Sequence, residues 1–116
     1  VEVRQCGGSG VAAYYGAFIT LIGAKTTVHH NCTDGNNPTG IQNEYGLQLW
    51  GPVFNSSSSA TIQLVSPLTK ELVSIDNGGG GNWGTNYGGD INRIKTIDAP
   101  AISSSPASVG ETKLIR

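Results

Sequence analysis

Residues 76–90 read DNGGGGNWGTNYGGD, and this stretch separates two segments whose composition is typical of β-strands. Seven of its fifteen residues are glycine, which reaches positive φ angles without steric cost. We therefore expect a long irregular loop here, because ordinary hairpin connections need only about two to five residues. A loop of this length that displays Trp83 and Tyr87 either contacts a ligand or partner or folds back over a sheet edge.

Short segments that favour β-strands lie on both sides of this loop. Residues 68–75 and 91–97 flank it directly, although the isoleucine spacing of 91–97 also fits a single helical turn. Residues 11–30 are apolar on both faces, which predicts a central strand covered on two sides, with a buried helix as the alternative for 11–22. Further segments with the composition of strands occur at 1–6, 41–50 and 60–65, and 112–116 could form a last strand.

Turn-forming residues interrupt these segments at intervals typical of all-β domains. Asp34-Gly35 and Gly51-Pro52 are examples, and Ser66-Pro67 joins 60–65 to 68–75 in what we interpret as a hairpin. There is no convincing amphipathic helix, and no internal repeat is evident. The sequence therefore predicts one all-β domain over residues 1–116, an antiparallel β-sandwich or small β-barrel with six to eight short strands.

Composition limits the classes of partner. Charged residues make up 13% of the chain, the net charge is −1, and Lys and Arg are scattered singly. Without a basic stripe to neutralise phosphates, nucleic acid is excluded as an expected partner. No apolar run approaches the roughly 20 residues of a membrane helix, so membrane insertion is not expected either.

Several features favour an extracellular protein. The chain begins at Val1 without Met, as a processed secretory product would, and its two cysteines fit one disulfide, Cys6–Cys32. Two free thiols are the alternative. Asn31 and Asn55 each begin a triplet that matches the N-glycosylation acceptor pattern. We therefore expect a secreted glycoprotein with one disulfide bond.

The chemistry of the glycine-rich stretch narrows its possible ligands. It lacks the Gly-Lys-Ser/Thr ending of a P-loop and the spacing of a dinucleotide fingerprint, so no nucleotide cofactor is expected. Asp76 and Asp90 could approach each other around calcium if the flanking strands paired, but no calcium-binding motif supports a metal. Aromatic faces bury the C–H face of a sugar while amide and carboxylate groups bond its hydroxyls. The candidate ligand-binding residues are Asn82, Trp83, Asn86, Tyr87 and Asp90.

His29 and His30 are the other candidates for chemistry. Adjacent strand residues point to opposite faces, so the two rings are not expected to share a metal. One of them could act as a general base with Glu44 and Arg93, as a small ribonuclease-like hydrolase would require. The spacing matches no known catalytic motif, so no catalytic residue is assigned.

The favoured interpretation is a secreted recognition protein of effector, elicitor or toxin type that binds a cell-surface protein or glycan. A carbohydrate-binding, lectin-like module is the first alternative, and a small secreted hydrolase is the second. Both recognition hypotheses depend on aromatic side chains that face the solvent.

Overall fold

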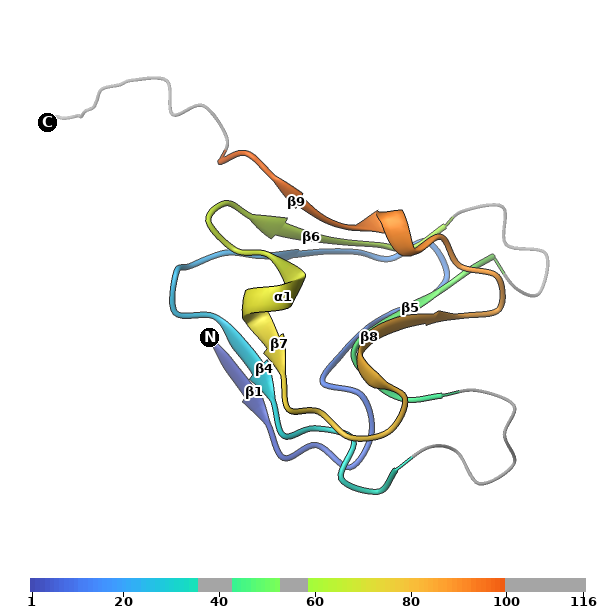
Figure 1. Cartoon of the computed structure of the whole chain (residues 1–116). Helices are drawn as coiled ribbons and strands as arrows, with labels where there is room; N and C mark the ends of the chain where they lie inside the picture. Colours follow the sequence, from blue (N-terminus) through green and yellow to red (C-terminus); the bar gives the residue numbers. More distant parts are fainter. Residues whose placement is uncertain (36–42, 53–58, 100–116) are drawn as a thin grey trace, which may run out of the picture.

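The computed structural model describes residues 1–35, 43–52 and 59–99, and every β-strand in this part of the chain pairs in parallel. The strands form three sheets of three: β1-β4-β7, β2-β5-β8 and β3-β6-β9. Consecutive strands belong to different sheets, so the chain winds through all three before it returns beside its starting strand. Three such rungs stack into a short parallel β-helix, which Figure 1 views roughly along its axis.

Each rung contributes one strand to each sheet. The first rung contains β1 (Glu2–Arg4), β2 (Val11–Ala13) and β3 (Phe18–Leu21). The second contains β4 (Thr27–His29), β5 (Tyr45–Trp50) and β6 (Thr61–Val65). The third contains β7 (Ser74–Ile75), β8 (Gly81–Asn86) and β9 (Ile94–Ile97), together with the short helix α1 (Lys70–Val73) and the 3-10 turn η1 (Ile91–Arg93).

The predicted antiparallel sandwich or barrel is therefore wrong, although the chain is rich in β-structure. The proposed hairpin of 60–65 and 68–75 does not form, because β6 and β7 lie in different sheets and α1 lies between them. Turn residues that we interpreted as hairpin connections instead mark the corners of the coil. Two strands that pair in parallel are separated by a full rung of the chain, so the turn residues next to a strand do not indicate which strand it pairs with.

Residues 11–30 are not one central strand or a buried helix, but three strands in three sheets. Tyr15 and Gly16 have positive φ angles of 53° and 78° at the corner between β2 and β3. Gly23, with a φ of 112°, makes the next corner before β4. Residues 11–30 look apolar on both faces because the chain bends between these strands, and each strand places its own apolar residues in the same core.

The glycine-rich stretch 76–90 also differs from the prediction, because it contains the six-residue strand β8 paired along β5. Glycine is needed there for close packing, since a Cβ on Gly84 would collide with the ring of Tyr45. The same ring lies 2.7 Å from the position that a Cβ would take on Gly80. The glycines therefore make room for an aromatic side chain across the sheet.

The core runs through the middle of the coil as columns of stacked side chains. Ile19, Ile62 and Ile94 lie in register across the β3-β6-β9 sheet, and Ile62 and Ile94 are buried. Val11, Leu47 and Trp83 form the matching column in the β2-β5-β8 sheet. Stacking buries apolar side chains that no single rung could cover, which explains why the coil folds as a unit.

An asparagine ladder closes the corner between the first and second sheets. Asn31 is 1% exposed, and its Oδ1 accepts from Cys6 N at 3.1 Å while its Nδ2 donates to Val3 O at 3.0 Å. One rung later, Asn77 Oδ1 accepts from Asn31 N at 3.0 Å and Asn77 Nδ2 donates to Val28 O at 3.1 Å. The amides thus pair backbone groups that the turning chain would otherwise leave unsatisfied.

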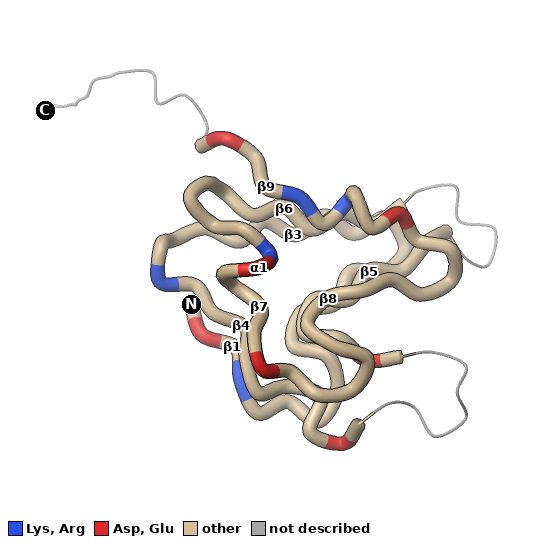
Figure 2. The backbone as a smooth tube through the Cα atoms, viewed as in Figure 1, with Lys and Arg blue, Asp and Glu red and all other residues tan. Residues whose placement is uncertain are grey.

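Charged residues are sparse around the described coil, and Figure 2 shows no continuous stripe of Lys and Arg. No helix among the described residues is long and apolar enough to cross a membrane. The predicted final strand, 112–116, and the proposed acceptor Asn55 lie outside the described residues.

Candidate functional site

Four aromatic side chains gather at the corner that follows the second sheet. Tyr14 follows β2, Trp50 ends β5 and Tyr87 follows β8, so each of the three rungs contributes one ring, and Tyr15 adds a fourth. The ring centroids are 4.3 Å apart for Tyr14 and Trp50, and 4.6 Å apart for Trp50 and Tyr87. Tyr15 lies 6.3 Å from Trp50 in an edge-on arrangement. These four residues are called the aromatic cluster below.

The aromatic cluster faces the solvent more than a core cluster would. Tyr14, Tyr15 and Tyr87 are 37%, 55% and 44% exposed, and Trp50 lies half-buried between them. Burial nevertheless raises the pKa of Tyr14, and the negative charge of Glu44 raises it further. The Nε1 of Trp50 is buried and has no hydrogen-bond partner within the described part of the chain. Exposed aromatic surface of this kind marks interaction sites in soluble proteins.

Polar side chains lie on the outer face of the same sheet. Asn86 and Asn43 form a reciprocal pair, in which Asn86 Oδ1 accepts from Asn43 N at 3.1 Å and Asn86 Nδ2 donates to Asn43 O at 2.9 Å. Glu44 accepts from the hydroxyl of Ser9 at 2.9 Å, and the amide of Gln48 is buried beside it. The contact with Ser9 holds the entry to β5 against the first rung, and the pair with Asn86 holds it against the third.

The predicted ligand-binding residues do not form one surface. Tyr87 belongs to the aromatic cluster, and Asn86 is the partner of Trp50 in the register of β5 and β8. Trp83 packs against the core and lies under Lys70, whose Nζ is 5.5 Å from the ring centroid. Asn82 joins the asparagine ladder by accepting from Asn77 N at 3.0 Å, and exposed Asp90 caps η1 by accepting from Asn92 N at 2.9 Å.

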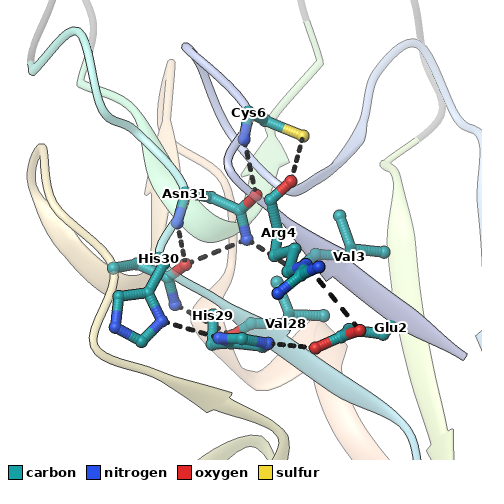
Figure 3. Close-up of polar contacts among 9 residues, drawn as sticks. Glu2, Val3, Arg4, Cys6, Val28, His29, His30 and Asn31 are labelled. Carbon is teal, nitrogen blue, oxygen red and sulfur yellow. Dashed lines mark hydrogen bonds and ion pairs between the residues drawn. The ribbon is translucent and has the colours of Figure 1, made fainter.

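The two histidines lie on the first sheet, away from the residues proposed to act with them. Arg93 donates to Ala60 O at 3.0 Å, and Glu44 bonds Ser9, so the proposed set of one histidine, Glu44 and Arg93 is not assembled. Glu2 contacts His29 instead: its Oε2 lies 2.6 Å from His29 Nε2 (Figure 3). The calcium arrangement also fails, since β7 and β9, which flank Asp76 and Asp90, lie in different sheets.

The predicted disulfide is absent, and Cys6 and Cys32 are both free thiols. The parallel register explains this, because Cys6 N bonds the side chain of Asn31 while Cys32 N bonds Gly8 O. Burial raises the pKa of the Cys32 thiol to about 11, with smaller contributions from Glu44 and Cys6. Asn31, predicted as a glycan acceptor, is buried, and its amide nitrogen donates to Val3 O; its glycosylation stays a prediction.

Sequence reasoning missed Tyr14, Tyr15 and Trp50 as a surface. The first two fall in residues 11–30, predicted as a central strand covered on two sides, and Trp50 ends the predicted strand 41–50. One feature of the sequence could have indicated this aromatic surface: Trp50 and Tyr87 each stand directly before a glycine at the end of a strand-like segment.

A scan of the chain against protein-family models finds no match, and searches of curated proteins and of solved structures also return none. The function must therefore be argued from the site itself.

Proposed function

We propose that this protein is a secreted carbohydrate-binding module that recognises a neutral glycan on a cell surface through the aromatic cluster. The observation that carries this proposal is the run of three aromatic rings, one from each rung, in which Tyr14 and Tyr87 stay 37% and 44% exposed. A pyranose buries its apolar C–H face against such rings, and the stack provides adjoining positions along the axis of the coil.

The rigidity of the scaffold supports this choice. Tyr14, Trp50 and Tyr87 each follow or end a paired strand, so the rings are positioned before any ligand arrives. A preformed aromatic surface loses little conformational entropy on binding, and large aromatic side chains contribute much of the energy at recognition surfaces. The phenol groups of Tyr14, Tyr15 and Tyr87 can donate to and accept from sugar hydroxyls.

Charge indicates the kind of glycan. Glu44 is the charged residue that raises the pKa of Tyr14, and a nearby carboxylate repels anionic sugars such as uronic acids or sulfated residues. The chain has a net charge of −1 and no basic stripe among its described residues. A neutral polysaccharide is therefore the favoured ligand.

The test is affinity electrophoresis and pull-down with neutral polysaccharides such as cellulose, chitin, xylan and β-glucan, with a polyuronate as the charged comparison. Tyr87→Ala should weaken binding about tenfold, which equals the roughly 1.4 kcal/mol expected from one stacked ring. Phe18→Ala is the matched control, since Phe18 is 63% exposed on β3 and forms no part of the aromatic cluster. Failure to bind any neutral glycan, or equal losses in both variants, would contradict the proposal.

A further inference from the structure

The rings of His29 and His30 lie against each other edge-on, contrary to the expectation that neighbours on a strand point to opposite faces. His29 is the last residue of β4, and His30 has a φ of 54°, in the left-handed region. That conformation turns the side chain of His30 back toward His29. The Nδ1 atoms of the two rings are 2.6 Å apart, and the ring planes are nearly perpendicular (Figure 3).

Glu2 fixes which nitrogen of His29 carries a proton. Its carboxylate oxygen Oε2 lies 2.6 Å from His29 Nε2. An ionised carboxylate only accepts hydrogen bonds, so His29 Nε2 carries the hydrogen and its Nδ1 presents a lone pair. A carboxylate that orients the far nitrogen of an imidazole in this way is the common outer partner of a metal-binding histidine.

We propose that His29 and His30 bind a divalent copper or nickel ion through their two Nδ1 atoms. Metal–nitrogen bonds of about 2.0–2.1 Å at right angles place two ligand nitrogens about 2.9 Å apart, whereas a tetrahedral site places them about 3.3 Å apart. The observed 2.6 Å has to open by about 0.3 Å for a square-planar or tetragonal ion, compared with about 0.7 Å for tetrahedral zinc. In both cases the rings also have to turn, because the two Nδ1 atoms now point at each other along a hydrogen bond and must converge on the metal. The pair therefore fits copper and nickel better than zinc.

The remaining coordination positions are open to water. No group of three or more His, Cys, Asp or Glu side chains that could hold a metal occurs in the described ranges, so the protein supplies two ligands. The histidines line an open hollow with Arg4 and Gln5, which leaves space for water on the metal. Arg4 lies 3.9 Å from Glu2, and its side chain is more than half exposed, so its charge is partly offset and screened by solvent.

Binding replaces the hydrogen between the two rings. Because the contact with Glu2 places the hydrogen of neutral His29 on Nε2, we infer that His29 Nδ1 accepts from His30 Nδ1–H across the 2.6 Å contact. When the metal takes both Nδ1 lone pairs, the hydrogen of His30 moves to its Nε2, and no net proton is released.

The experiment is a copper titration of the untagged full chain, followed by calorimetry and by electron paramagnetic resonance. The expected spectrum shows nitrogen couplings from two imidazoles, and His30→Ala should leave one and lower the affinity at least tenfold. These are the only two histidines in the chain, so the couplings can be assigned directly. His30 is exposed and His29 is half-buried, and a thermal melt of each variant confirms that it folds.

Glu2→Ala separates positioning from ligation. It should keep both nitrogen couplings while lowering the copper affinity about tenfold, as expected when an outer hydrogen-bond partner is lost. Nickel should compete with copper more effectively than zinc does. Copper spectra without two imidazole nitrogens, or an affinity unchanged in His30→Ala, would overturn the assignment.

Discussion

Replacement of Asn31 by alanine should destabilise the protein far more than replacement of an exposed asparagine. The variant removes the acceptor for Cys6 N and the donor to Val3 O, and it deprives Asn77 Oδ1 of one of its two donors. An unsatisfied buried polar group costs about 1–3 kcal/mol. With two backbone groups left unpaired beside a 1% exposed side chain, we expect a loss of about 2–5 kcal/mol in the free energy of unfolding.

The assay is urea denaturation followed by tryptophan fluorescence, since Trp50 and Trp83 both lie in paired strands. The midpoint should fall while the slope stays constant, because the area exposed on unfolding hardly changes. Asn92→Ala is the matched control at an exposed position of η1. Thr33→Val separates the ladder from glycosylation, because it removes the acceptor triplet but leaves Asn31 in place. A loss in Asn31→Ala within about 0.5 kcal/mol of the Asn92→Ala value would refute the ladder's role.

Three further predictions follow from the fold. Gly84→Val should lower the melting temperature strongly, because the new side chain collides with the Tyr45 ring. Gly35→Ala should lower it less, because this position has open space around it and the variant suffers only the strain of a positive φ. Equal melting temperatures of the two variants would contradict the packing. Thiol titration of the unreduced, denatured protein should count two free thiols, and a count of zero would instead demonstrate a disulfide. In the native protein, the buried Cys32 should react far more slowly than Cys6. The pKa of Glu2 in the folded protein lies below its usual 4.5, so the stabilising contribution of this carboxylate should be present above pH 4.5 and disappear as the pH falls through the folded pKa. The stabilities of the parent and of Glu2→Gln should therefore converge in acid. A constant difference between them down to pH 2 would contradict this.

Individual strands were more predictable from the sequence than their pairing. The alternation in residues 1–6, 41–50 and 60–65 correctly predicts β1, β5 and β6. The direction of pairing was not predictable from that alternation, because an inward apolar face and an outward polar face look alike in parallel and antiparallel sheets. Partners in the first sheet are separated by 25 and then 46 residues, so no constant period reveals the rungs.

The candidate site was predicted only in part, and the reasons are specific. Tyr87 was predicted as a ligand-binding residue and lies in the aromatic cluster, but Trp83, on β8, packs against the core because its register matches Leu47. The proximity of His29 and His30 depends on one left-handed residue, which strand periodicity does not anticipate. Asn31 and Asn77 each follow a strand of the first sheet, and such a recurrence at corners is the clearest signal of a parallel coil that the sequence contains.

The central claim is that the aromatic cluster binds a neutral glycan, and the two indole N–H resonances of Trp50 and Trp83 test it most directly. In an NMR titration with soluble cello-, chito-, xylo- and β-gluco-oligosaccharides, one of these should shift the Trp50 resonance progressively. The Trp83 resonance should stay fixed, because that ring packs on the core beneath Lys70. A shift confined to Trp83, or no shift of Trp50 with any neutral oligosaccharide, would contradict the account.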